Sequence, residues 1–174
     1  MPASFKDQLA LVDELLAEVR RMEHGERRRS AAPLPGGYEQ ELRLAGLAQR
    51  VAQAYTIMEG VLAFVARRID RTALTGEDWH KKLILRSTQP CQDPPRPAVI
   101  SAELAGELLE LCQFRHVVRS IYPTRLDAVR VAENLQRLIG CAPQFGTQCR
   151  AFATGLPAAG KTSRNRATPR RRKK

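Results

Sequence analysis

The sequence predicts an all-α protein, a single bundle of five to six helices followed by a basic tail. Apolar residues recur at steps of three, four or five through most of the chain, which is the spacing of a helix with one buried face. Leu, Ala, Arg and Glu dominate, whereas β-branched residues are scattered and no convincing pair of strands is present. Segments rich in Pro and Gly separate the periodic stretches, as expected for short connections between antiparallel helices.

The first half of the chain contains two predicted helices. Residues 4–23 place apolar side chains at helical spacing, and Ser4 is a candidate N-cap. The stretch at 24–37, HGERRRSAAPLPGG, is predicted to be a loop because it holds two prolines, three glycines and a run of charges. The longest apolar repeat runs over 38–69, and a second loop follows at 71–76.

The second half contains four shorter predicted helices, which are residues 77–88, 102–122, 125–139 and 143–156. Residues 89–100 contain four prolines and are therefore expected to lack extended regular structure. Ser101 is the candidate N-cap of the helix that follows, and Pro123 ends that helix. Gly140 is expected to end the next helix.

Length and composition exclude several classes of protein. The 174 residues suit one domain, and no apolar run approaches the roughly 18 residues of a membrane span. The start, MPASFKDQLALVDELL, lacks the basic region of a secretory signal, so we expect a cytoplasmic protein without membrane association. The four cysteines have no CxxC spacing and the three histidines are far apart, so we expect reduced thiols, no metal site and no cofactor.

The net charge of +11 is concentrated near the C-terminus. Eight basic residues and no acidic one follow position 158, so residues 1–158 carry 21 basic and 18 acidic residues. A segment such as TSRNRATPRRRKK has little to bury, and we expect 157–174 to be a disordered tail. Two interpretations of the tail stay open, a solubilising segment and non-specific attraction to phosphate backbones.

Residues 155–162, GLPAAGKT, satisfy the phosphate-loop pattern G-x-x-x-x-G-K-[ST]. That pattern binds phosphate when a strand feeds the loop and a helix follows it. Here the preceding residues have a helical pattern and only twelve residues follow. We therefore interpret the match as chance.

The segment at 114–122, FRHVVRSIY, carries the clearest functional signal. Residues three or four apart on a helix are neighbours, so Arg115, Arg119 and Tyr122 share one side, and His116 and Ser120 lie beside it. Guanidinium groups can hold a phosphate, and an imidazole can move a proton. The set suits a phosphodiester, although a solvent-facing helix side with arginines paired to carboxylates gives the same pattern.

This arrangement resembles the HEPN superfamily, specifically the HepT-like proteins, ribonuclease toxins paired with minimal nucleotidyltransferase antitoxins. Their signature is Arg, four residues, His, one residue and Tyr, and Arg115 and Tyr122 match its two ends. Further blocks that resemble the family are QAYTIMEGVLAFVARRID (53–70), GEDWHKKLI (76–84) and RPAVIS (96–101). The resemblance implies an N-terminal helix and loop at 1–37, a HepT-like helical domain at 38–156 and the tail at 157–174.

The resemblance also implies a function, that of a metal-independent endoribonuclease toxin acting on RNA. It gives catalytic roles to Arg115, His116 and Tyr122, RNA contacts to Arg119, Ser120 and His80, and modification by the partner antitoxin to Tyr122. We expect a homodimer with one shared basic cleft, edged by Phe114, Val118 and Ile121.

One position departs from the family pattern, because Ser120 stands where the signature has His. A hydroxyl cannot replace an imidazole as general acid or base. Either His116 or His80 substitutes for it, or the activity is weakened or lost. Two alternatives to an active toxin therefore stay open, a catalytically degenerate RNA- or protein-binding module of such a locus and a helical scaffold with a nucleic-acid-binding tail.

Three features near this signature are open to a structural interpretation. Glu59 faces either solvent or Arg115, and in the second case it would orient the guanidinium. Trp79 is expected to be a packing anchor, with His80 half-exposed or catalytic. The basic residues at 67–71 suit a helix C-terminus and need no ligand.

Overall fold

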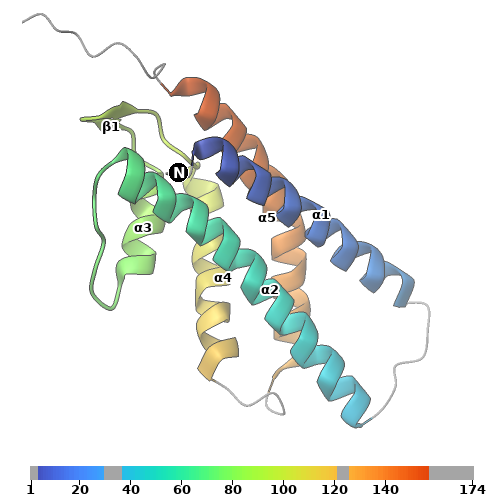
Figure 1. The fold of residues 1–174 in the computed structure, drawn as a ribbon. Helices are drawn as coiled ribbons and strands as arrows, with labels where there is room; N and C mark the ends of the chain where they lie inside the picture. The colour runs from blue at the N-terminus through green and yellow to red at the C-terminus, as the bar shows by residue number, and fades with distance from the viewer. Residues whose placement is uncertain (1–3, 30–36, 121–125, 157–174) are drawn as a thin grey trace, which may run out of the picture.

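The computed structural model describes residues 4–29, 37–120 and 126–156, and they form the predicted all-α bundle (Figure 1). The helices are α1 (Phe5–Arg29), α2 (Tyr38–Phe64), α3 (Trp79–Ser87), α4 (Ala102–Ser120) and α5 (Ala128–Gly155). A π-helical turn, η1 (Val65–Ile69), continues α2, and strands β1 (Cys91–Gln92) and β2 (Pro95–Arg96) form a small hairpin. The predicted tail at 157–174 lies outside the described residues.

Helix α1 begins where the sequence predicts and extends further. The Asp7 carboxylate accepts a hydrogen bond from the Ser4 backbone N–H at 2.6 Å, which caps the first turn. The prediction of a loop from residue 24 was wrong, because the helix continues to Arg29. An i, i+4 ion pair between Glu23 and Arg27, at 2.6 Å, supports these extra turns across Gly25.

Helix α2 and η1 together cover the predicted helix at 38–69. The last turn widens, since the Asp70 backbone N–H bonds to the Val65 carbonyl, five residues back, at 2.9 Å. Arg71 then takes a positive φ of 53° and the chain leaves the helix axis. This widened turn delivers Asp70, which is 6% exposed, into the interior.

A buried ion pair holds the segment between α3 and α4 against the end of α2. Arg96 Nε and Nη2 donate to the two Asp70 oxygens at 2.5 and 2.7 Å, and Arg96 Nη1 reaches the Gln89 carbonyl at 2.7 Å. Arg86 Nε on α3 donates to the same carboxylate at 2.9 Å. The expectation of no strand pair was wrong here, because the proline-rich stretch folds into the β1–β2 hairpin that carries Arg96.

The last two predicted helices are one helix, and Gly140 does not end it. Asp127 caps α5 by accepting from the Val129 N–H at 2.9 Å, and the helix runs to Gly155 through Pro143. Interior Gly and Pro cost about 1 and 3 kcal/mol relative to Ala. Packing outweighs that cost, because the buried residues on both sides form one stripe, consisting of Leu138, Cys141, Ala142, Phe145 and Cys149.

The hydrophobic core lies between helices α1 and α5 on one side and helices α2 and α4 on the other. Helix α1 packs along α5 and α2, and α4 packs along α2 and α5, as Figure 1 shows. At Gly146, a Cβ would lie 2.9 Å from Leu16 Cδ1, so α1 and α5 approach closely there. Cys112 is buried in this core. No helix within the described ranges is long and apolar enough to cross a membrane.

Candidate functional site

Glu59 is the centre of a buried polar cluster built from three helices. It projects from α2 and is only 6% exposed. One carboxylate oxygen accepts from the Tyr55 hydroxyl at 3.0 Å, one helical turn earlier, and also contacts His80 Nδ1 on α3. The other oxygen accepts from Arg115 Nη1 on α4 at 3.3 Å. The packing therefore decides between the two interpretations of Glu59, since the carboxylate faces Arg115 and not solvent.

Arg115 is held at the edge of this cluster. Its side chain is 11% exposed, and its guanidinium carbon lies 5.9 Å from the centre of the Tyr55 ring. The carboxylate and the ring face together fix a cation that would otherwise have several rotamers. An oriented guanidinium suits the recognition of a phosphate.

His80 is more enclosed than a half-exposed side chain. Its side chain is 14% exposed, and the Trp79 ring lies against it at 3.8 Å between centroids. His116 is exposed on α4, and its ring meets that of His80 edge-on at 5.4 Å. Two imidazoles from different helices therefore adjoin the Glu59 cluster.

Both imidazoles line an open depression of about 400 Å³ between α3 and α4. Its rim carries mixed charge, with Glu77, Asp78 and Glu110 near Lys81. Gln113 completes a row at every third residue of α4 from Glu110 to His116. Sequence reasoning missed this row, although its regular spacing was a usable signal.

The other predicted site residues lie further along α4 or beyond it. Arg119 and Ser120 are exposed, and the Ser120 hydroxyl donates to the backbone carbonyls of His116 and Val117 at 2.8 and 3.2 Å. Ser120 thus caps its own helix, and neither of its hydrogen bonds within the described residues reaches the cluster. Tyr122 lies outside the described residues. The expectation that Phe114 edges a cleft was wrong, because its side chain is 2% exposed and belongs to the core.

Burial keeps two weakly acidic groups beside Glu59 in their neutral forms, the Tyr55 hydroxyl and the Cys112 thiol. It raises the pKa of Tyr55 far above the ordinary value, with smaller contributions from Cys112 and Glu59. It also raises the pKa of the Cys112 thiol, which the Tyr55 hydrogen bond offsets only in part. Tyr55 therefore serves as a hydrogen-bond donor to Glu59. Among the described residues, no group of three potential metal ligands occurs.

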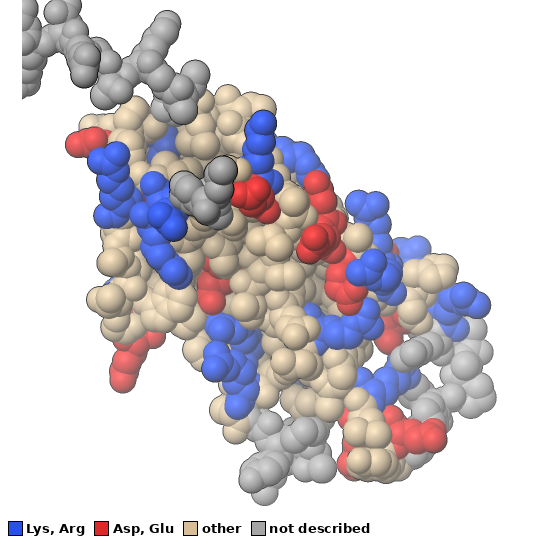
Figure 2. All heavy atoms as spheres, in the orientation of Figure 1, with Lys and Arg blue, Asp and Glu red and all other residues tan. Residues whose placement is uncertain are grey.

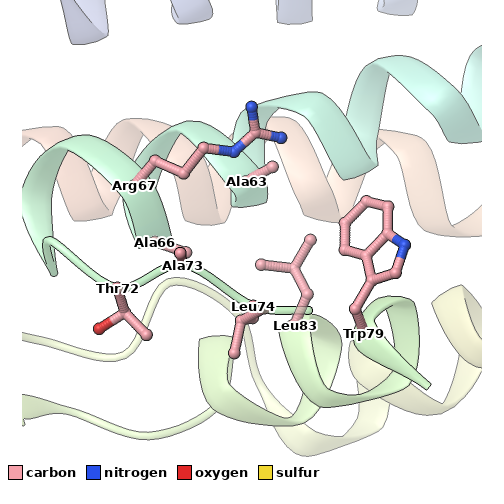
Figure 3. A pocket seen from close by; sticks show the side chains of 8 residues that line it. All are labelled: Ala63, Ala66, Arg67, Thr72, Ala73, Leu74, Trp79 and Leu83. Carbon is pink, nitrogen blue, oxygen red and sulfur yellow. The ribbon is translucent and has the colours of Figure 1, made fainter. Parts of the chain in front are cut away.

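A second, smaller pocket has Trp79 and Leu83 of α3 in its lining (Figure 3). It has a volume of about 140 Å³, and its lining includes the side chains of Arg67, Trp79 and Leu83. Its lining contains no histidine, cysteine or acidic residue. The predicted packing role of Trp79 is confirmed by its contact with the core.

The charges on the visible face are unevenly arranged. Figure 2 shows basic side chains gathered over the C-terminal end of α2 and the loop after it, where Arg67, Arg68 and Arg71 are exposed. Along α1, basic and acidic side chains alternate, and Glu18 pairs with both Arg21 and Arg50. A group of exposed basic side chains therefore lies at the C-terminal end of α2, whereas Arg21 and Arg27 on α1 are ion-paired.

A family model described as HepT-like protein matches residues 46–156. The chain belongs to the HepT-like family. This confirms the resemblance and, with it, membership of the HEPN superfamily. The matched range of this HepT-like protein contains the whole Glu59 cluster and excludes α1. No curated protein and no solved structure matches the chain.

Proposed function

We propose that this HepT-like protein is the toxin of a toxin–antitoxin pair and cleaves RNA without a metal ion. The observation that carries the proposal is the convergence of Arg115, His80 and His116 around Glu59, within the part of the chain that matches the family. Cleavage by the ribose 2′-hydroxyl needs a group that stabilises the phosphate charge and groups that move protons. Arg115 takes the first role and His116 the second.

The proposed partners follow from the same family. A minimal nucleotidyltransferase antitoxin would silence the toxin by adding adenylate to Tyr122, because the added bulk and negative charge exclude RNA. A homodimer would place two α4 helices around one substrate. Within a single chain the depression has a mixed rim, so Arg119 of a second copy would add the positive charge that an RNA backbone requires. Light scattering at micromolar concentration tests the dimer, and a monomer mass contradicts it.

A specific observation favours the second candidate, a catalytically degenerate module that binds RNA or its antitoxin. Ser120 occupies the position of the signature His, and among the described residues its hydroxyl bonds only to its own helix backbone. In a degenerate module the buried Glu59–Arg115 pair would serve packing, and the surface alone would bind the partner.

An RNA-cleavage assay of the full chain in EDTA separates the two candidates. The toxin proposal expects shorter products that end in a 2′,3′-cyclic phosphate, and it expects Arg115→Ala to abolish them. Lys82→Ala on the exposed side of α3 is the matched control for the loss of one basic residue. RNA that binds but stays intact favours the degenerate module.

A further inference from the structure

The structure assigns proton transfer to a pair of histidines, with His80 as general base and His116 as general acid. This inference rests on the proposed ribonuclease function and names the machinery that replaces the signature His at Ser120. The two rings come from different helices, lie 5.4 Å apart and line one depression of about 400 Å³. The inference places the scissile phosphate in that depression, beside both imidazoles and Lys81.

His80 is built to accept a proton at one ring nitrogen. Its Nδ1 contacts the Glu59 carboxylate, which is an acceptor, so the neutral ring carries its hydrogen on Nδ1. Nε2 then holds the free lone pair. Glu59 is itself anchored by Tyr55 and Arg115 at 3.0 and 3.3 Å, and Trp79 covers one face of the ring. An imidazole with a fixed tautomer and a fixed plane is the arrangement of a general base.

His116 differs from His80 in ways that suit the opposite role. It is exposed, and no carboxylate among the described residues bonds to its ring. Because solvent reaches it, it can be reprotonated between turnovers. It lies one residue after Arg115 on α4, so the proton donor and the phosphate-binding cation share one rigid element.

The proposed step balances without a further reactant. The His80 Nε2 lone pair removes the proton of the ribose 2′-hydroxyl, and the 2′-oxygen forms a bond to phosphorus. The bond from phosphorus to the 5′-oxygen breaks, and that oxygen takes a proton from His116. The products are a 2′,3′-cyclic phosphate and a 5′-hydroxyl, and the two histidines have exchanged protonation states. Water then restores both.

A pair of substrates distinguishes the base from the acid. RNA has a poor leaving group that needs a proton, whereas uridine 3′-(4-nitrophenyl) phosphate releases a phenolate that does not. His116→Gln should lose about 10²–10⁴-fold on RNA and little on the nitrophenyl ester. His80→Gln should lose activity on both substrates. His24→Gln is the matched control, since His24 is exposed on α1 and makes no contact with the cluster.

The outcomes separate this inference from the proposed function. Wild-type cleavage that His80→Gln leaves unchanged overturns the base assignment while the ribonuclease function stands. Equal losses on both substrates for His116→Gln overturn the acid assignment. A wild-type chain that cleaves neither substrate overturns both the inference and the proposed function.

A second measurement covers the case in which His80→Gln fails to fold. Nitrogen-15 spectra of wild-type protein labelled at histidine should show neutral His80 protonated at Nδ1. A hydrogen on Nε2 instead contradicts the base assignment. Because His116 is exposed, His116→Gln should keep the wild-type melting curve, so its substrate comparison is interpretable in either case.

Discussion

Replacing Asp70 by Asn should destabilise the protein far more than removing a partly exposed carboxylate with just as many arginine partners. Asp70 accepts from Arg96 at 2.5 and 2.7 Å and from Arg86 at 2.9 Å, and the side chains of Asp70 and Arg96 are 1% and 2% exposed. Breaking a buried pair by removing one partner costs about 3–5 kcal/mol. Arg96 keeps its hydrogen bond to the Gln89 carbonyl, so we expect the lower end, about 3 kcal/mol.

The matched control is Glu18→Gln. Glu18 also contacts two guanidinium groups, those of Arg21 and Arg50, but these side chains are 66% and 46% exposed. Exposed ion pairs contribute about 0–1 kcal/mol. For a protein of this size about 3 kcal/mol corresponds to a fall of roughly 6–12 °C in Tm, against roughly 0–4 °C for the control. Urea unfolding and thermal melts of the two variants give the comparison.

The pH dependence gives a second check on the same pair. Burial acts to raise the pKa of Asp70, but the hydrogen bonds from Arg96 and Arg86 outweigh it and hold the pKa below the ordinary value. Because the folded-state pKa is lowered, the stabilisation is present above the unfolded-state pKa of about 3.9 and is lost as the pH falls through the folded-state value. The gap between wild type and Asp70→Asn should therefore narrow below pH 4. If Asp70→Asn lowers the free energy of unfolding at pH 7 by no more than Glu18→Gln does, the reasoning is refuted.

Three further predictions concern the site and the tail. Adding Ser120→His to His116→Gln should restore part of the lost cleavage, because an exposed imidazole one turn further along α4 can donate a proton; no recovery in a folded double variant contradicts this. Co-expression with the nucleotidyltransferase encoded by a neighbouring gene should add adenylate to Tyr122, which peptide mass spectrometry detects. If the toxin is fully neutralised while Tyr122 stays unmodified, the antitoxin acts by another route. Truncation after Leu156 should leave Tm nearly unchanged and remove a salt-sensitive attraction to polyanions, and a large loss of stability counts against this.

Periodicity predicted the helices that have one continuous apolar face and failed where local propensity and packing disagree. The apolar repeat over 38–69 predicted the first residue of α2 and the last residue of η1. Gly140 was predicted as a helix end from its propensity, but the buried stripe on both sides of it keeps α5 continuous. The end of α1 was missed for a similar reason, since side-chain ion pairs leave no trace in an apolar repeat.

The candidate site was only partly predictable because it is assembled from three helices. Spacing within one helix put Arg115 and His116 together, and it places Tyr55 one turn before Glu59. The contact between Glu59 and His80 joins residues 21 positions apart, and nothing in either helix alone implies it. Its origin is the packing of α3 against α2 and α4, which turns a short polar helix toward a carboxylate.

The pairing of α1 with α5 has a consequence for the synthesis of the chain. Val12 and Leu15, which are fully buried in the finished bundle, pack in an interface that needs residues of α5. The ribosome must add roughly 100 residues between the end of α1 and the start of α5, which takes on the order of 5–20 s. At the end of that interval α2, α3 and α4 are complete and can bring Glu59 and Arg115 together. The part of the apolar face of α1 that packs on α5 stays open to chaperones until this last helix emerges and closes the bundle.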